Sequence, residues 1–463
     1  MKPLALSRIA RWTGGRIAGA PAGADMLIDA IATDTRTLDA SDGRAALFVA
    51  LKGERFDGHA HVREAAEAGA RAALVAREVD APVAQVVVAD TERALAALAA
   101  AVQHARSGKV VAVTGSNGKT SVKTLLLSIL QRAGRTYANP GNRNNEIGLP
   151  LAVLDAPEDA QFAIYEMGAG KPGDIAYLTA IARPDVALVN NVAPAHLERM
   201  GNLLGVADTK GAIYDALPVG GVAVINADDA FAPYFAERAH GRRLIRFGLE
   251  SSADVTARDI LADESGTRFV LASPEGDIPV TLALPGRHNV LNALAAASLA
   301  LGAGAPLDAI GAGLDAARPV AGRLVTHRLP GGATLIDDSY NANPGSLNAA
   351  IDTLASAPGE SWLVLGDMRE LGADAEALHA EAGRRAKAAG IARLFTLGPL
   401  SAAAASGFGS GAAHFESHDA LAQALRRAMG GGVRVLVKGS RGSAMDKVVR
   451  ALLPPTGDAT HAA

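Results

Sequence analysis

Short apolar segments rich in β-branched residues alternate with Ala- and Leu-rich segments along almost the whole chain. Each short segment is nearly all apolar and too short for a helix, which is typical of parallel strands covered on both faces. After Thr120, apolar residues recur at helical spacing until Gly134. Alternating βα units of this kind predict an α/β fold with right-handed crossovers. The expected buried strands are Val110–Thr114, Phe162–Glu166, Val186–Asn190, Val222–Ile225, Leu335–Asp338, Trp362–Leu365 and Val433–Val437.

Chain length and local breaks divide the sequence into three expected domains. A chain of 463 residues has room for about three domains of ordinary size. A helix over Thr91–His104 opens the second segment, and a turn at Pro319–Arg323 opens the third. Leu397–Gly411 is rich in Gly, Ala and Ser and is interpreted as a loop or weak helix, and the tail from Pro454 is expected to fray. The expected domains are 1–88, 89–317 and 318–463.

Composition narrows the classes of function. Cysteine is absent, which excludes disulfides, thiolate nucleophiles and Cys-ligated metal sites. Lys and Arg number 45 against 48 Asp and Glu, and the net charge of −3 offers no general electrostatic case for binding nucleic acid or anionic membranes. No apolar run has the pattern of a secretion signal or a membrane span. We therefore expect a cytoplasmic protein that binds no nucleic acid and does not cross a membrane.

The strongest local motif is VVAVTGSNGKTS at Val110–Ser121, where a strand leads through a glycine turn into a helix. This arrangement points backbone N–H groups and a helix N-terminus at an anion. Lys119 would reach the β- and γ-phosphates of a nucleotide, and Thr120 or Ser121 would supply a hydroxyl to Mg²⁺. Val113 stands where the strict Walker pattern has a glycine, and a purely structural turn is the alternative. The residues expected to contact the nucleotide here are Thr114, Gly115, Ser116, Asn117, Gly118, Lys119, Thr120 and Ser121.

Further motifs follow in order over nearly the whole chain. They are Gly141–Pro150, Tyr165–Gly168, Asn190–Glu198, Lys210–Gly211, Leu284–Ala293, Gly322–Arg323 and Lys438–Gly442. Together with TGSNGKTS, this series resembles the muramyl peptide ligases of bacterial cell-wall synthesis and the related folylpolyglutamate synthases. The resemblance implies a small N-terminal α/β domain that binds a UDP-sugar, a central P-loop-type ATPase domain with a parallel or mixed sheet, and a C-terminal Rossmann-like domain.

The segment DDSYNANP at Asp337–Pro344 distinguishes among members of this family. It is similar to the ligase that joins D-alanyl-D-alanine to UDP-N-acetylmuramoyl-tripeptide, and the resemblance implies these two substrates. The implied reaction consumes ATP, passes through an acyl phosphate and forms the pentapeptide precursor of peptidoglycan, on an enzyme expected to be a monomer. An earlier muramyl ligase, a folylpolyglutamate synthase or a P-loop GTPase is the alternative, although a GTPase should carry an Asn-Lys-x-Asp motif that is absent here. The third residue of the tripeptide, diaminopimelate or lysine, stays open.

The resemblance assigns catalytic or metal-binding roles to Lys119, Thr120, Glu166, His196 and Lys210. Glu166 ends an apolar strand at the carboxyl edge, where open α/β sheets bind ligands, and it is the implied ligand of a first Mg²⁺ together with Thr120. A solvated strand end is the alternative. His196 is the implied ligand of a second Mg²⁺, against the alternative of a surface or core histidine. Lys210 lies on a predicted helix with one solvated face and is implied to be carbamylated, which makes it a carboxylate-like ligand; a surface lysine is the alternative.

Other residues are implied to contact ATP. Asn289 and Asn292 are spaced i, i+3 on one face of a predicted helix, where they would hydrogen-bond an adenine edge. The alternative is that Asn289 caps the helix that follows it. Arg323 follows a glycine turn and would reach the γ-phosphate. Asp338 would contact the ribose or the phosphates, although the adjacent Asp337 leaves this assignment open.

The remaining candidates are polar residues in short loops, and the resemblance implies that they bind the substrates. Thr35 and Arg36 lie in the segment similar to the UDP-sugar-binding region. Lys438 and Arg441 lie in a Gly/Ser loop after a strand, which is a nest-like site for an anion. The full set of implied substrate contacts is Thr35, Arg36, Asn142, Asn144, Asn145, Asn341, Asn343, Lys438 and Arg441.

Overall fold

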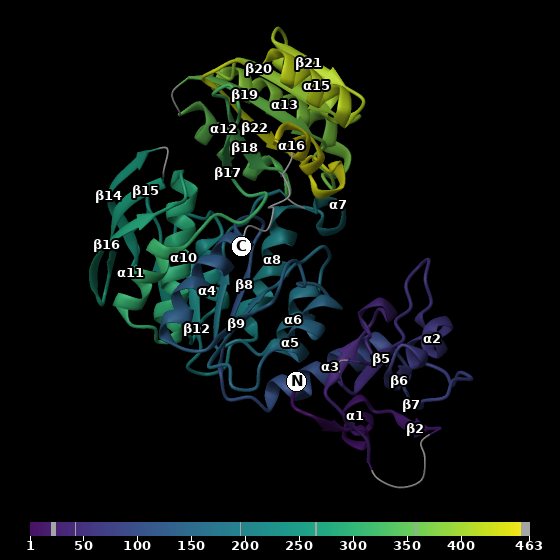
Figure 1. Ribbon diagram of the computed structural model, residues 1–463. Helices are drawn as coiled ribbons and strands as arrows, with labels where there is room; N and C mark the ends of the chain where they lie inside the picture. Colours follow the sequence, from purple (N-terminus) through teal and green to yellow (C-terminus); the bar gives the residue numbers. More distant parts are fainter. Residues whose placement is uncertain (20–24, 42, 195, 264–265, 357–358, 455–463) are drawn as a thin grey trace, which may run out of the picture.

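The computed structural model describes residues 1–19, 25–41, 43–194, 196–263, 266–356 and 359–454, so nearly all of the tail expected to fray lies outside the described residues. Three α/β units follow one another along the chain, from the purple N-terminal unit through the central unit to the yellow-green C-terminal unit (Figure 1). The predicted α/β class with three domains is confirmed. Among the helices of the described residues, none is long and apolar enough to cross a membrane.

The N-terminal unit contains a five-stranded sheet in which only the edge strand β2 runs antiparallel to its neighbour. In spatial order its strands are β2 (Arg16–Ala18), β7 (Ala84–Val87), β6 (Ala70–Val75), β5 (Ala46–Val49) and β4 (Ala30–Ala32). The other elements are β1 (Leu4–Ala5), α1 (Leu6–Thr13), β3 (Leu27–Ile28) and α2 (Val62–Glu67). Helix α3 (Thr91–His104) has the predicted bounds, and its Leu95 and Leu98 are buried in a core shared with the central unit.

The central unit is a six-stranded parallel sheet with helices on both faces. In spatial order its strands are β13 (Arg243–Phe247), β12 (Val222–Asn226), β11 (Val186–Val189), β8 (Lys109–Thr114), β10 (Phe162–Glu166) and β9 (Thr136–Ala138). Alternate residues of β8 enter opposite cores: Val110 and Ala112 pack on one face, and Val111 and Val113 on the other. One face is covered by α3, α5 (Gly148–Asp155), α6 (Asp174–Ala182), α8 (Leu203–Asp215) and α9 (Ala232–Arg238), and the other by α4 (Lys119–Ala133), α10 (Arg287–Ala303) and α11 (Leu307–Ala316).

A three-stranded antiparallel sheet, which the sequence patterns did not predict, extends the central unit. Its strands are β14 (Thr256–Asp263), β15 (Gly266–Ser273) and β16 (Gly276–Leu282). Leu271 and Leu282 are buried in the core formed by α4, α10 and α11. The outer strand β14 is largely exposed and carries charged side chains, so it lacks the continuous apolar run that marks the other strands.

The C-terminal unit is a six-stranded sheet in which only β17 is antiparallel. In spatial order its strands are β17 (Val325–Arg328), β18 (Thr334–Asp338), β22 (Val433–Lys438), β19 (Glu360–Gly366), β20 (Arg393–Leu397) and β21 (Ala412–Phe415). Its helices are α12 (Pro344–Ala355), α13 (Ala375–Ala388), α14 (Ser401–Phe408), α15 (His418–Ala428) and α16 (Asp446–Leu452). Helices α12, α13 and α14 pack on one face and α15 and α16 on the other, as in a Rossmann-like fold.

Helix α14 lies in Leu397–Gly411, which the sequence left between a loop and a weak helix. A glycine on each helix, Gly407 on α14 and Gly383 on α13, lets the two helices approach each other closely. A Cβ at Gly383 would stand 2.0 Å from the carbonyl oxygen of Ala404, and one at Gly407 would stand 2.3 Å from that of Ala380. Glycine lowers the intrinsic stability of a helix, but the close packing of α13 and α14 requires glycine at these positions.

The carboxyl ends of strands from two units face one another. In the central sheet Glu166 pairs in register with Val113, and Val189 with Thr114. In the C-terminal sheet Asp338 pairs with Lys438. Ligands of open α/β sheets bind at such carboxyl edges, so this junction is where the fold places a site.

Candidate functional site

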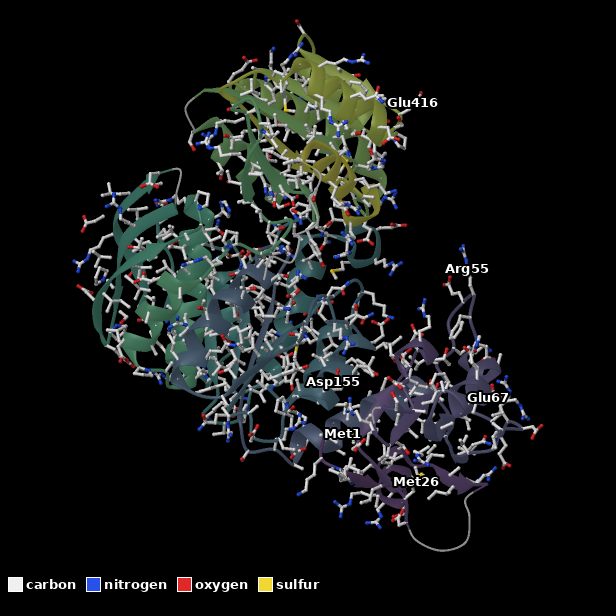
Figure 2. The ribbon with its side chains drawn as sticks, viewed as in Figure 1. Met1, Met26, Arg55, Glu67, Asp155 and Glu416 are labelled. Atoms are coloured by element: carbon white, nitrogen blue, oxygen red, sulfur yellow. The ribbon has the colours of Figure 1, made fainter. Side chains whose placement is uncertain are left out.

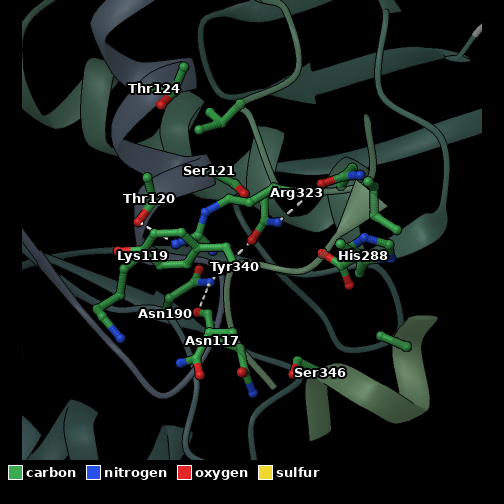
Figure 3. A pocket seen from close by; sticks show the side chains of 18 of the residues that line it. Asn117, Lys119, Thr120, Ser121, Thr124, Asn190, His288, Arg323, Tyr340 and Ser346 are labelled. Carbon is green, nitrogen blue, oxygen red and sulfur yellow. Dashed lines mark hydrogen bonds between the residues drawn. The ribbon is translucent and has the colours of Figure 1, made fainter. Parts of the chain in front are cut away.

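A cavity of about 520 Å³, here named the interdomain cavity, lies between the central and C-terminal units. Figure 3 shows its walls from close by, with Lys119 and Thr120 of the phosphate loop beside Arg323 and Tyr340 of the C-terminal unit. The predicted site residues that line it are Ser116, Asn117, Gly118, Lys119, Thr120, Ser121, Asn142, Asn144, Glu166, Asn289, Asn292, Arg323, Asp338, Asn341, Asn343, Lys438 and Arg441. The fold thus brings together most of the candidates named from the sequence.

The phosphate loop between β8 and α4 has a backbone that only glycine suits at its last position. Gly118 has φ 78°, and a Cβ there would stand 2.5 Å from both the Nδ2 of Asn190 and the Oδ1 of Asn292. Lys119 is the first residue of α4, and its ammonium donates to the carbonyl of Gly115 at 2.7 Å. Burial lowers the pKa of Lys119, Glu166 opposes that shift, and Arg323 adds to it.

Glu166 is the centre of a buried polar network at the end of β10. Its carboxylate accepts hydrogen bonds from the hydroxyl of Thr120 and the amide of Asn144, both at 2.9 Å, and pairs with Lys123 at 3.2 Å. Burial opposes ionisation, but Lys123 and Lys119 outweigh it and hold the pKa of Glu166 below its usual value. The carboxylate is therefore ionised and aimed at the start of α4.

Arg323 connects the C-terminal unit to this network. Its guanidinium donates to the hydroxyl of Thr120 at 2.9 Å and lies over the ring of Tyr340, 4.5 Å from the centroid. Arg441 lies 5.7 Å from the same centroid, so one aromatic ring contacts two cations that line the cavity. Tyr340 in turn donates its backbone N–H to the carbonyl of Gly322, which fixes the turn that carries Arg323.

Two further polar pairs belong to the C-terminal wall. The amide of Asn343 donates to the side-chain oxygen of Asn117 at 2.8 Å, and Asn343 also caps α12 through Ser346. The buried ammonium of Lys438 donates to Asp338 and to the carbonyl of Asn341. Asp338 lines the cavity, whereas the carboxylate of Asp337 accepts from Ser339.

The start of α10 forms the wall beside Asn190. The helix begins at Arg287 with Gly286 as its N-cap, so the alternative in which Asn289 caps the helix is wrong. Asn289 and Asn292 are both buried on the face that meets the cavity, and Asn292 accepts from Asn190 at 3.2 Å. His288 lines the same wall, and burial together with Lys438 lowers its pKa to about 4, so its imidazole is neutral.

A second cavity of about 330 Å³, here named the side cavity, shares the walls formed by Lys119 and Asn144 with the interdomain cavity. Its other lining residues are Asn145, Glu146, Gly168, Ala169, Gly170, Lys171, Asp174, Tyr177, Leu178, His196 and Arg199. His196 has a left-handed backbone (φ 54°) and pairs with Glu370 of the C-terminal unit. Burial lowers the pKa of His196, against the opposing effect of Glu370.

Lys210 is fully buried on α8, with 1% of its surface exposed, so the surface alternative is wrong. The helix is enclosed on more sides than the predicted amphipathic pattern suggested, because it packs between the central sheet and its neighbouring helices. Burial and the nearby Lys119 lower the pKa of Lys210 to about 7. Lys210 lines neither cavity wall, although it lies within electrostatic reach of His196 and Lys119.

Four other predicted site residues lie away from both cavities. The hydroxyl of Thr114 is buried and donates to the carbonyl of Met167, and Gly115 lies behind the loop against Asn190. Thr35 donates to Glu64, and Arg36 pairs with Asp34 on the surface of the N-terminal unit. The structure therefore does not bring the Thr35–Arg36 loop to the phosphate loop.

Four polar residues with a part in the interdomain site were not singled out from the sequence. Asn190, His288 and Tyr340 line the cavity, and Lys123 pairs with Glu166 from one turn beyond Lys119. Asn190, His288 and Tyr340 lie inside sequence motifs that were recognised as a whole, but no individual role was predicted for them. Nothing in the local pattern separates Lys123 from an ordinary helical lysine.

The phosphate loop offers oxygen donors for a metal ion, but the described residues contain no larger cluster of metal-ligating side chains. No group of three or more His, Asp or Glu side chains gathers as a metal site among them. Thr120 and Glu166 nevertheless place two oxygen donors 2.9 Å apart at the phosphate loop. This pair suits a hard cation whose remaining ligands come from phosphate and water.

The fold and the interdomain cavity define a three-domain, P-loop nucleotide-binding protein whose C-terminal unit contacts the phosphate loop. Three family models match in chain order: the Mur ligase family catalytic domain at 28–111, the Mur ligase middle domain at 113–300, and the Mur ligase glutamate ligase domain at 322–441. The chain therefore belongs to the Mur ligase family.

Individual relatives are similar over nearly their full lengths. The UDP-N-acetylmuramoyl-tripeptide–D-alanyl-D-alanine ligase of Escherichia coli (strain K12) is 46% identical over 93% of this chain and 95% of its own. A structure of the UDP-N-acetylmuramoylalanyl-D-glutamyl-2,6-diaminopimelate–D-alanyl-D-alanyl ligase from Acinetobacter baumannii is 33% identical, with a TM-score of 0.87 and 98% of both chains covered. The MurF ligase from Thermotoga maritima, solved in complex with ADP, is 29% identical with a TM-score of 0.82, covering 91% of this chain and 96% of its own.

Proposed function

We propose that this chain is an ATP-dependent ligase that joins D-alanyl-D-alanine to the terminal carboxylate of UDP-N-acetylmuramoyl-tripeptide and releases ADP and phosphate. The observation that carries the proposal is the meeting of two cavities at Lys119 and Asn144. One cavity contains the phosphate loop, and the other opens beside it, where a carboxylate can approach the γ-phosphate. The E. coli and A. baumannii relatives bear this activity in their names, and the T. maritima relative binds ADP.

In the first step an oxygen of the tripeptide carboxylate attacks the γ-phosphorus, the bond to the β-phosphate oxygen breaks, and ADP leaves. Two anions must be held together for this attack, so the site needs positive charge on both sides of the γ-phosphate. Lys119 lies in the wall shared by both cavities, and Arg323 lies across the interdomain cavity above Thr120. These cations compensate the charge that develops as the acyl phosphate forms.

In the second step the amine of D-alanyl-D-alanine attacks the acyl carbon. The tetrahedral intermediate collapses to the amide, and phosphate leaves with the oxygen that came from the carboxylate. The dipeptide is proposed to bind at the C-terminal wall, where Asn341, Lys438 and Arg441 line the interdomain cavity. Arg441 supplies positive charge where the dipeptide carboxylate would lie, and Lys438, whose charge is partly compensated by Asp338, adds to it.

Mg²⁺ is the proposed metal cofactor, with Thr120 and Glu166 as ligands of a first ion and His196 and Lys210 as ligands of a second. When bound, the cation neutralises phosphate charge during the transfer. The ionised carboxylate of Glu166 and its 2.9 Å contact with Thr120 support the first site. The second site gains its support from the burial of Lys210 near His196.

Lys210 is proposed to be carbamylated in the active enzyme. Carbon dioxide reacts only with a neutral amine, and the pKa of about 7 leaves much of Lys210 neutral near pH 7. The product is an anion, which relieves the repulsion between Lys210 and Lys119. A buried carbamate also supplies the negative ligand that a second cation beside neutral His196 needs.

We propose that residues 1–88 bind the UDP-sugar, that residues 89–317 bind ATP and that residues 318–463 close over the nucleotide. Asn289 and Asn292 are proposed to hydrogen-bond the adenine. Since one chain lines both cavities, we propose that the enzyme acts as a monomer. Its dependence on ATP suits a cytoplasmic step in cell-wall precursor synthesis. The third residue of the tripeptide is proposed to be 2,6-diaminopimelate, the residue named in the A. baumannii relative.

The test is phosphate release by the purified protein. With ATP, UDP-N-acetylmuramoyl-tripeptide and D-alanyl-D-alanine together, we expect stoichiometric phosphate and pentapeptide. Omitting D-alanyl-D-alanine should stop turnover. Product formation with glutamate or free diaminopimelate as the amine would instead assign the chain to another reaction of the family.

A further inference from the structure

The wall of the side cavity carries unpaired charges of both signs. Glu146 comes from the loop before α5, Lys171 from the loop before α6 and Arg199 from α7 (Leu197–Met200). Within the described parts of the chain, the side chains of these three residues form no hydrogen bond or ion pair. Charged groups left unpaired on a concave wall are available to a ligand.

A buried hydroxyl in the same wall also lacks a partner. The phenolic oxygen of Tyr177 on α6 is buried and has no hydrogen-bond partner among the described residues. A buried polar atom without a partner costs free energy, so the hydroxyl of this lining residue is available as a donor to a ligand group that comes within reach. Burial and the nearby Glu92 raise the pKa of Tyr177 to about 12, so the hydroxyl keeps its proton and can donate.

Glu92, near the N-terminal end of α3, adds negative charge close to Glu146. Glu92 lies within electrostatic reach of Glu146 and Asp90, and burial together with these carboxylates raises its pKa. Lys171 favours the ionised form of Glu92 and so opposes this rise in its pKa. The cavity therefore presents a negative region and a cation side by side, which is the complement of a zwitterion.

The proposed reaction determines which part of the substrate reaches this wall. The attacking carboxylate must lie at Lys119, and it belongs to the third residue of the tripeptide. The side chain of that same residue starts one bond away from the reacting carboxyl group. The side cavity, which begins at Lys119, is therefore where this side chain extends.

We propose that Glu146 and Lys171 bind the free amino-carboxylate end of the 2,6-diaminopimelate side chain, with Glu146 accepting from its ammonium and Lys171 and Tyr177 donating to its carboxylate. This inference rests on the proposed function. Lysine differs from diaminopimelate only by lacking the distal carboxylate, and 2-aminopimelate only by lacking the distal amine. The lysine substrate is therefore diagnostic for Lys171 and Tyr177, and the 2-aminopimelate substrate for Glu146.

The experiment compares three UDP-N-acetylmuramoyl-tripeptides that end in diaminopimelate, lysine or 2-aminopimelate, with phosphate release as the readout. The wild-type protein should have the lowest KM for diaminopimelate. Loss of the distal amine removes the charged hydrogen bond to Glu146, and loss of the distal carboxylate removes those from Lys171 and Tyr177, so each change should raise KM by about tenfold or more while kcat changes little. Lys171→Met should raise KM for diaminopimelate and leave KM for the lysine substrate unchanged. Glu146→Gln should raise KM for diaminopimelate and leave KM for the 2-aminopimelate substrate unchanged. Tyr177→Phe should have the same pattern of effects as Lys171→Met, with a smaller rise in KM for diaminopimelate.

Lys447→Met and Glu416→Gln are matched controls, because both residues are exposed in the C-terminal unit, and Figure 2 shows Glu416 far from the central unit. Both should keep the wild-type order of KM values. Equal KM values for the three substrates in the wild-type protein, or an order that Lys171→Met and Glu146→Gln leave unchanged, would overturn this inference while the ligase function stands. Absence of phosphate release with every tripeptide would overturn the proposed function and the inference with it.

Discussion

The carboxylates that line the interdomain cavity are paired with cations, whereas two charged residues that line the side cavity, Glu146 and Lys171, are not paired. In the interdomain cavity, Glu166 is held by Lys123 and Thr120, and Asp338 by Lys438. In the side cavity, Glu146 and Lys171 form no ion pair within the described residues. Groups that must stabilise a transition state are best fixed in advance, whereas groups that recognise a substrate can wait for it. We therefore assign the chemical steps to the interdomain cavity and recognition of the tripeptide side chain to the side cavity.

Lys119 belongs to both cavities, so its removal should have the largest effect. We expect Lys119→Ala to lower kcat by roughly 10²- to 10³-fold, because charge compensation at the transferring phosphoryl group is lost. The variant should stay folded, which circular dichroism can verify, and Lys447→Ala serves as a control. Turnover of Lys119→Ala at the parental rate would mean that the loop is structural.

Lys210 tests whether catalysis needs a further anion within electrostatic reach of Lys119 and His196. Lys210→Ala should lower activity by roughly tenfold to 100-fold, as loss of a metal ligand or its support commonly does. A small carboxylate such as acetate should restore part of the rate by occupying the vacated space. Full activity of Lys210→Ala at limiting Mg²⁺, without added carboxylate, would exclude a carbamate.

Tyr340 tests whether the interdomain cavity depends on prearranged cations. Tyr340→Leu removes the ring that contacts Arg323 and Arg441, and we expect KM for ATP to rise by roughly threefold to tenfold. Tyr340→Phe retains the ring and should behave like the parent. If both variants raise KM equally, the hydroxyl rather than the ring matters.

Asn343 gives the smallest expected effect and separates folding from closure. Asn343→Ala removes the cap of α12 and the bond to Asn117, and should lower stability by about 1 kcal/mol. Asn202 caps α8 without a bond to the C-terminal unit, so Asn202→Ala is the matched control. Calorimetry should show similar losses for both, with a raised KM for ATP only in Asn343→Ala. A raised KM in both variants would contradict a specific role for the contact between units.

The parts of the site that could be predicted from the sequence are those that a local pattern defines. The phosphate loop needs a strand, a glycine turn and a helix in immediate succession, and the structure contains all three around Gly118. Glu166 was predicted to end a strand at the carboxyl edge of the sheet, and it does end β10 there. The alternation of apolar strands likewise predicted the parallel sheets of the central and C-terminal units.

The parts that could not be predicted depend on contacts between distant segments. Arg323 bonds Thr120 across 203 positions, and no periodicity records such a pairing. Lys210 was compatible with a solvated helix face because the sequence shows only its own helix and not the elements that cover it. The antiparallel sheet of β14 to β16 was not predicted, because its outer strand β14 carries exposed charged residues instead of a continuous apolar run.

Oxygen transfer from the tripeptide to phosphate tests the meeting of the two cavities most directly. The terminal carboxylate of the tripeptide is labelled with ¹⁸O, and the released phosphate is analysed by mass spectrometry after reaction with ATP and D-alanyl-D-alanine. If the carboxylate in the side cavity attacks the γ-phosphate at Lys119, each phosphate carries one ¹⁸O atom. Phosphate without ¹⁸O, at normal pentapeptide yield, would show that no acyl phosphate forms between the two cavities.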